Sequence, residues 1–129
     1  MNAEVAQVLA QDPKKTALVA LKTFFNIMEK WGVKNEQQMV LLGRPSSGTF
    51  FNWKKGKVAS IPVDTLERIS YVMGIYKALG ILFPTRAQAD AWPNKANQAF
   101  DGQTAIEYIT KGSLVNLIHL RRYLDAQRG

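Results

Sequence analysis

The sequence contains no cysteine and one histidine, His119. Without cysteine the chain can form neither a disulfide framework nor a thiolate metal site, and one histidine argues against structural zinc. No apolar run approaches the length of a membrane span, and the first residues, MNAEVAQVLAQDPKK, carry an acid where a secretory signal carries basic charge. We therefore expect a cytoplasmic protein.

The residue patterns of enzymes are also missing from the sequence. We find no nucleophile with a recognisable base, no carboxylate pair suited to acid and base catalysis, and no cluster of metal ligands. A glycine-rich phosphate loop followed by a lysine and a hydroxyl is absent as well. The sequence therefore predicts a protein that is not an enzyme and needs no cofactor.

Positive charge is in excess. Lys and Arg number 17 against 10 Asp and Glu, a formal net charge of +7. Residues 1–84 hold eleven cations and six anions, a net charge of +5, and residues 85–129 hold six and four, a net charge of +2. This balance favours an acidic partner, with nucleic acid ahead of membrane because no helix combines a cationic stripe with an aromatic opposite face.

Capping and breaker residues predict an all-α fold. The expected helices cover residues 13–31, 36–42, 47–55, 62–82, 85–92, 104–110 and 114 to near the end. On the first helix Leu18, Leu21, Phe25 and Met28 recur at helical spacing, and on the fourth Met73 and Tyr76 continue the apolar series. The break at Phe83-Pro84 divides residues 14–84 from residues 85–129, and the order of residues 1–13 is left open.

The short segments 36–42 and 47–55, joined by a tight turn, suit a DNA-reading helix-turn-helix, in which the first helix braces and the second enters the major groove. Phe50 and Trp53, three residues apart, form the core edge of the reading helix. Outward side chains would then contact phosphates and base edges, with asparagine suited to adenine and an aromatic to a thymine methyl. The predicted DNA-binding residues are Arg44, Ser46, Ser47, Thr49, Phe51, Asn52, Lys54, Lys55 and Lys57.

Simpler interpretations of these residues stay open. Ser46 can serve only as a helix N-cap, and the lysine run can be an ordinary solvated loop. The turn Gly43-Arg44-Pro45-Ser46 is also about one residue longer than the commonest version of the motif.

The segment AWPNKANQAFDGQTAIEYITKGSLVNLIHLRRYLDAQRG resembles the C-terminal domain of the Xre/MbcA/ParS family of antitoxins. The likeness lies in the tryptophan-centred turn, the asparagine before Phe100-Asp101-Gly102, and the last helix with its Tyr-Leu-Asp-Ala ending. Ala105 stands where the family commonly has proline. The part from Leu41 to Phe83 resembles the Xre-like helix-turn-helix domain of the same family, so the likeness covers nearly the whole chain from about Leu21.

The resemblance implies an N-terminal Xre-like helix-turn-helix domain followed by a small helical toxin-binding domain. Members neutralise a partner toxin, usually a RES-domain protein that consumes NAD, and Xre-type members repress their own operon by binding a palindromic promoter element as a homodimer. The end of the chain commonly reaches the toxin's active-site cleft. The toxin-binding residues implied by position are Asn97, Phe100, Arg121, Arg122, Tyr123 and Arg128.

Arg121, Arg122 and Arg128 also support this role physically, since arginines at the chain end would compete for a pocket shaped for dinucleotide phosphates. Alternatively, Arg121 and Arg122 are a solvated helix face that favours the helix dipole. Two other functions also stay open. One is a stand-alone transcription regulator whose C-terminal helices serve dimerisation, and the other is an antitoxin that does not bind DNA.

Overall fold

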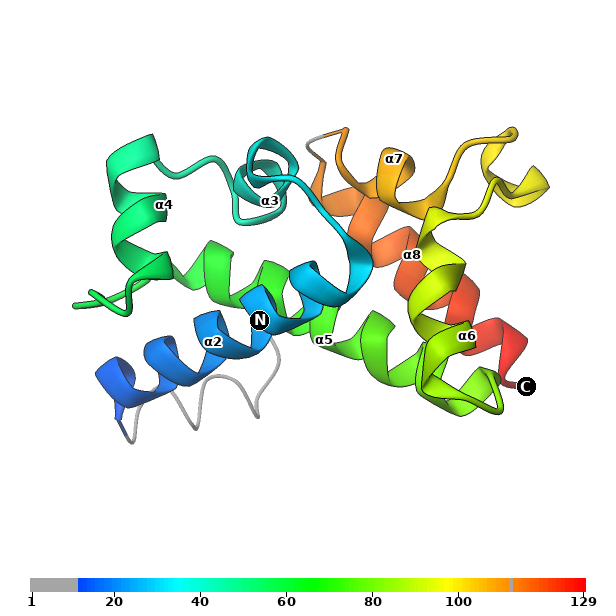
Figure 1. Cartoon of the computed structure of the whole chain (residues 1–129), viewed down its shortest axis with the longest axis horizontal. Helices are drawn as coiled ribbons and strands as arrows, with labels where there is room; N and C mark the ends of the chain where they lie inside the picture. Colours follow the sequence, from blue (N-terminus) through cyan, green and yellow to red (C-terminus); the bar gives the residue numbers. More distant parts are fainter. Residues whose placement is uncertain (1–11, 112) are drawn as a thin grey trace.

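A computed structural model describes residues 12–111 and 113–129, which are helical with no strand (Figure 1). The all-α prediction is therefore confirmed. The order of residues 1–13, which the sequence left open, concerns mainly residues 1–11, and these lie outside the described residues. The elements in chain order are α2 (Pro13–Trp31), α3 (Asn35–Leu41), α4 (Ser47–Lys54), α5 (Val63–Leu82), α6 (Arg86–Ala91), η1 (Trp92–Asn94), η2 (Gln98–Phe100), α7 (Ala105–Ile109) and α8 (Leu114–Gln127).

Most helix ends lie where the capping residues predict them. Asp12 accepts a hydrogen bond from the Lys15 amide at the start of α2, and Gly32, with φ of 66°, ends that helix in the left-handed conformation. Thr104 and Glu107 form the predicted capping box of α7. Helix α3 begins one residue earlier than predicted, with Lys34 at its N-cap position and Asn35 as its first residue.

Helix α5 is the central element, and it packs against both α2 and α8. Leu66, Ile69, Val72, Ile75 and Leu79 of α5 are buried, and together with the buried residues of the other helices they form one hydrophobic core. This core therefore joins residues of the helix-turn-helix part to residues of the C-terminal part.

The inward faces of α2 and α5 differ in part from the prediction. Leu18 and Met73 are exposed, and Phe25 is only partly buried. On α2 the buried stripe is instead Ala17, Ala20, Leu21, Phe24, Ile27, Met28 and Trp31. Because α2 carries apolar residues on two faces, helical spacing alone did not distinguish the face that packs on α5.

Tyr76 of α5 joins the end of α2 to α6. Lys30 donates a hydrogen bond to the Tyr76 hydroxyl at 2.9 Å, and this bond raises the pKa of Lys30. On the other side the Arg86 guanidinium lies 3.7 Å from the centre of the Tyr76 ring. Asn94 adds a 2.7 Å hydrogen bond from its side-chain amide to the Trp31 carbonyl. These contacts fix the C-terminal part relative to α2.

The helix-turn-helix is held to α5 by a buried hydrogen bond. The Thr65 hydroxyl donates to the Leu42 carbonyl at 2.9 Å, and Leu42 lies in the turn that follows α3. Because Leu42 and Thr65 are almost fully enclosed, water does not replace a lost donor there.

Replacing Thr65 by valine should lower the free energy of unfolding by about 1–2 kcal/mol, because the Leu42 carbonyl would lose its donor while the packing volume stays the same. Thr23→Val on α2 is the matched control, since Thr23 is half-buried but makes no such bond. Urea denaturation of both variants measures the difference. Equal stabilities would show that the bond does not hold the motif.

Candidate nucleic-acid interface and C-terminal surface

The turn between α3 and α4 has an unusual backbone. Gly43 and Arg44 both adopt positive φ, 91° and 63°, so two successive residues turn in the left-handed sense. The Gly43 amide donates to Val40 and the Arg44 amide to Met39, which closes the end of α3. The turn delivers α4 to one end of the molecule's long axis, opposite the C-terminus (Figure 1).

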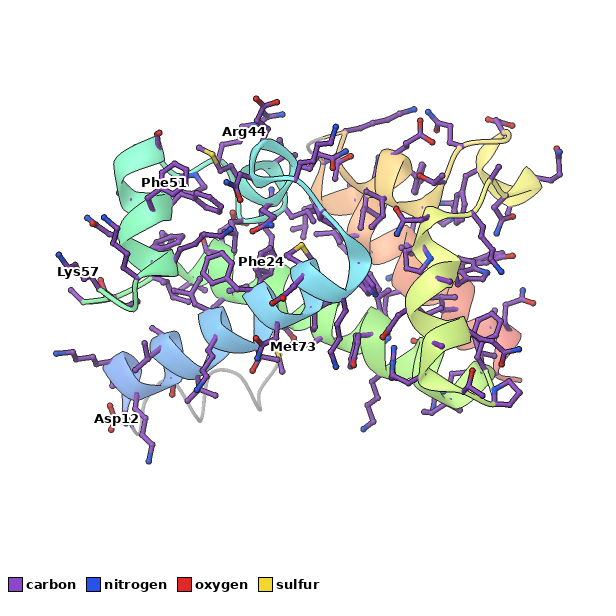
Figure 2. All side chains as sticks on the ribbon, viewed as in Figure 1. Asp12, Phe24, Arg44, Phe51, Lys57 and Met73 are labelled. Atoms are coloured by element: carbon purple, nitrogen blue, oxygen red, sulfur yellow. The ribbon has the colours of Figure 1, made fainter. Side chains whose placement is uncertain are left out.

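Helix α4 has the two predicted faces. Phe50 and Trp53 are buried, as predicted, and the Phe50 ring meets the Phe25 ring of α2 edge to face at 5.8 Å. All nine predicted DNA-binding residues are exposed. Phe51 is 44% exposed and its ring meets the Phe50 ring edge to face at 5.1 Å, so it presents an aromatic surface to solvent (Figure 2).

The start of α4 is organised by two hydroxyls. Ser46 accepts a hydrogen bond from the Thr49 amide at 3.2 Å and donates one to the Thr49 hydroxyl at 2.9 Å. Ser46 is therefore an N-cap, the simpler of the two interpretations left open. Ser47 and Gly48 follow as exposed first-turn residues, and a Cβ at Gly48 would meet no atom within 4 Å. The fold thus does not require glycine at this position.

The cations around α4 differ in what they contact. Arg44 and Lys57 project away from the body (Figure 2), and neither they nor Lys55 make an ion pair within the described residues. The Lys54 ammonium instead donates to the Asn35 side-chain oxygen at 2.7 Å. Three of the predicted phosphate contacts are therefore free to meet an anion, and one is already engaged.

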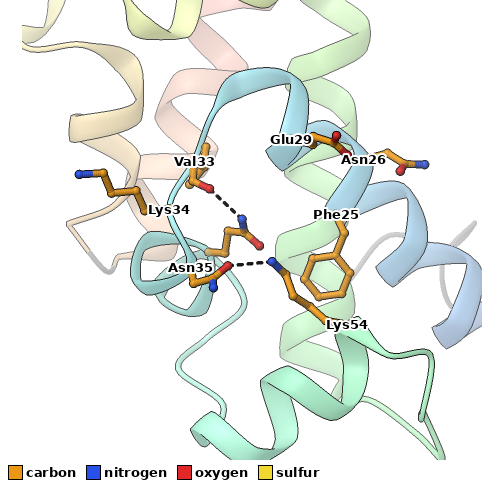
Figure 3. A pocket seen from close by; sticks show the side chains of 8 residues that line it. Phe25, Asn26, Glu29, Val33, Lys34, Asn35 and Lys54 are labelled. Carbon is orange, nitrogen blue, oxygen red and sulfur yellow. Dashed lines mark hydrogen bonds between the residues drawn. The ribbon is translucent and has the colours of Figure 1, made fainter.

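A cleft of about 550 Å³ lies between α2, α3 and the end of α4 (Figure 3). Gln38 lies within it, 5% exposed, and its side-chain nitrogen donates to the Val33 carbonyl at 2.8 Å. The lining residues are Phe25, Asn26, Glu29, Val33, Lys34, Asn35, Gln38 and Lys54. Asn35 as the partner of Lys54 was not predicted, because no sequence pattern pairs two residues that lie 19 positions apart.

Asn97 and Phe100 were predicted to contact a toxin; Asn97 is partly exposed and stays a candidate contact, whereas Phe100 is buried. The Asn97 side chain accepts from the Ala99 amide at 2.9 Å and so caps η2. Phe100 is 3% exposed and is stacked on Tyr108, with ring centres 4.8 Å apart. The Phe100 side chain therefore builds the C-terminal core and leaves the surface to its neighbours.

Two of the three terminal arginines share one acidic partner within α8 and its end. Asp125 pairs with Arg121 at 3.0 Å and with Arg128 at 3.4 Å. The Arg121 guanidinium also lies against Gly74 of α5, where a Cβ would collide with it. Arg122 is exposed and has no ion pair in the part of the chain that the structure describes. The expected basic terminus is thus reduced to Arg122 and the partly shielded Arg128.

Aromatic side chains of α8, η1, η2 and α7 pack together in the C-terminal part. The Tyr123 ring is stacked with Trp92 at 6.5 Å and meets Phe100 edge to face at 5.4 Å, and both Tyr123 and Trp92 are half-exposed. His119, to which the sequence assigned no role, accepts or donates a 2.6 Å hydrogen bond with the Tyr108 hydroxyl. Of the predicted toxin contacts in this part of the fold, Arg122 and Arg128 are exposed and Tyr123 is partly exposed.

The described residues contain no group of side chains suited to hold a metal ion. None of their helices is long and apolar enough to cross a membrane. The exposed helix α4, whose neighbouring cations Arg44, Lys55 and Lys57 have no ion pair among the described residues, is followed by a helical C-terminal module, and this arrangement defines the class: a helix-turn-helix protein with a C-terminal domain.

Comparison with known proteins gives the family. Residues 16–74 match the antitoxin Xre-like helix-turn-helix domain, and residues 78–129 match the antitoxin Xre/MbcA/ParS C-terminal toxin-binding domain. The chain is 43% identical over 109 residues to the uncharacterized protein y4oB of Sinorhizobium fredii (strain NBRC 101917 / NGR234), covering 84% of each chain. No solved structure matches. The chain belongs to the Xre family of antitoxins.

Substitution of Phe100 and Arg122 by alanine should separate a core residue from a surface residue. Phe100→Ala should lower the free energy of unfolding by about 3–5 kcal/mol because it leaves a cavity among packed rings. Arg122→Ala should change it by less than about 0.5 kcal/mol. Thermal and urea denaturation measure both, and a stable Phe100→Ala protein would return Phe100 to the list of surface contacts.

Proposed function

We propose that this antitoxin neutralises a RES-type, NAD-consuming toxin by covering its active site, and that it represses its own operon by binding promoter DNA. The observation that carries the proposal is the arrangement of the two matched domains. Helix α4, with its free cations, and the C-terminal end of α8 lie at opposite ends of the molecule (Figure 1), so each can present its own surface to a separate partner.

The DNA-binding role is supported by the side chains of α4 and the residues around it. Arg44, Lys55 and Lys57 are free to neutralise phosphates, and Asn52 and Phe51 face outward between them. Gly48 adds a second argument. Glycine in a helix costs stability, and since the fold leaves open space around it, a close approach of another molecule explains its use better than packing does.

The toxin-binding role is supported by the family match and by the surface of α8. Arg122 is exposed and has no ion pair among the described residues, and the neighbouring residue Tyr123 stacks with Trp92 to form an aromatic surface that is partly exposed. Tyr, Trp and Arg are the residues that most often dominate protein interfaces. A guanidinium suits a cleft built for the phosphates of NAD, and the choice of a RES-type partner rests on the family resemblance.

The proposal includes a homodimer on a palindromic promoter element, because two copies of α4 would read two half-sites related by symmetry. Both roles are cytoplasmic. Co-expression with the product of the adjacent gene, followed by affinity capture and a promoter shift assay, tests the two partners together. Capture of a RES-domain protein is expected, and an adjacent gene without such a product would favour a stand-alone regulator.

For DNA binding, Asn52→Ala should relax sequence preference at one base position by about 1–3 kcal/mol. Lys57→Ala should instead weaken binding to all sequences alike and reduce the slope of log affinity against log salt by about 0.9. Titrations against promoter and unrelated DNA at several salt concentrations measure both effects. Unchanged affinity and slope in the two variants would rule out α4 as the reading helix and favour an antitoxin that does not bind DNA.

For toxin binding, Arg122→Glu should abolish protection of cells that express the toxin, because an acid would face the anion-binding cleft, while promoter binding stays intact. Lys95→Glu is the matched control, an exposed charge reversal in the same domain. Growth of co-expressing cells and capture of the toxin measure the result. Full protection by Arg122→Glu would remove Arg122 from the interface.

A further inference from the structure

Lys54 occupies a different environment from the lysines that follow it. Its ammonium lies 2.7 Å from the side-chain oxygen of Asn35, which is the first residue of α3. Figure 3 marks this hydrogen bond with a dashed line. The same nitrogen lies 5.5 Å from the ring centre of Phe25 on α2 and 5.3 Å from that of Phe50 on α4. Both distances are within the range of cation–π attraction.

These contacts join three helices at the end of the reading helix. Helix α4 is eight residues long, too short to be stable without tertiary contacts. It contacts α2, where the Phe50 ring meets the Phe25 ring, and its other large buried residue is Trp53. Because these apolar contacts are not directional, we expect them to restrain rotation of α4 less than a hydrogen bond does. Lys54, in the last turn of α4, adds a polar link to the start of α3. This link opposes such rotation.

The same geometry argues against Lys54 as a simple phosphate contact. A lysine that neutralises phosphate needs an ammonium that is not held by other partners. Lys55 and Lys57 meet this condition, because they make no ion pair within the described residues. Lys54 would have to give up a hydrogen bond to Asn35 and its position over two rings. Because the Asn35 side chain is uncharged, this hydrogen bond is not an ion pair, and salt does little to weaken it.

We propose that Lys54 is a positioning residue, which holds α4 at the angle needed to read DNA by tying it to Asn35 of α3 and Phe25 of α2. The inference rests on the proposed DNA binding of α4, and it assigns affinity for phosphate to Arg44, Lys55 and Lys57 instead. It also gives Asn35, an exposed residue of α3 that lies outside the reading helix, a role in DNA recognition.

Asn35→Ala distinguishes the two roles by the sign of its effect. If Lys54 positions α4, the variant should bind promoter DNA about five- to tenfold more weakly with an unchanged salt slope, because no charge has been removed. If Lys54 contacts phosphate, Asn35→Ala frees its ammonium, and affinity should stay the same or rise. An affinity for promoter DNA that stays the same or rises would overturn the proposal.

Lys54→Met and Lys55→Met form a matched pair, since each keeps the unbranched stem and removes one ammonium. Lys54→Met should weaken binding without changing the salt slope, whereas Lys55→Met should lower the slope by about 0.9. The double variant Asn35→Ala/Lys54→Met should bind no more weakly than either single variant, because both remove one interaction. A slope lowered equally by both methionine variants contradicts the assignment.

Hydrogen exchange in the free protein tests the link without DNA. Asn35→Ala and Lys54→Met should each speed amide exchange in residues 50–55 by about five- to tenfold, and Lys55→Met should not. Amide exchange as slow as in the wild type in all three variants would overturn the proposal, even if the protein binds DNA. If wild-type protein fails to bind promoter DNA while the exchange differences appear, the DNA-binding function is wrong and the link between α3 and α4 stands.

Discussion

The burial of α5 between α2 and α8 is the interaction on which the rest of the structure depends. Its apolar side chains, each worth about 1.5–3 kcal/mol when fully enclosed, face α2 on one side and α8 on the other. Helix α2 in turn supports α4 through Phe25 and Phe50, and α8 carries Arg122 and Tyr123. One helix therefore sets the distance and orientation between the proposed DNA surface and the proposed toxin surface.

The two surfaces use charge differently. Near α4 the cations Arg44, Lys55 and Lys57 have no acidic partner in the described part of the chain, and this suits a long-range attraction to DNA. On α8 and at its end Arg121 and Arg128 share one carboxylate, that of Asp125, and of these three arginines only Arg122 has no ion pair among the described residues. Such a surface suits specific contact with a protein more than general attraction to an anion.

Local signals in the sequence predicted most of the fold. Asp12, Gly32 and Thr104 placed helix ends because capping is decided by residues within one turn. The inner and outer faces of α4 also followed from spacing, since Phe50 and Trp53 are its only large buried residues. Pairings across the fold could not be predicted, as with Lys54 and Asn35 or Arg121 and Gly74, because they depend on how helices cross. Phe100 was assigned by position in a family motif, which does not distinguish a buried residue from a surface residue.

The central claim is that one chain carries two independent surfaces held apart by α5. The most direct measurement is a promoter mobility shift with the antitoxin alone and with the purified antitoxin–toxin complex, supported by the mass of each species in solution. The account predicts a ternary complex in which toxin and DNA are bound at the same time. Release of the DNA whenever the toxin binds would contradict it, because the two partners would then compete for one surface.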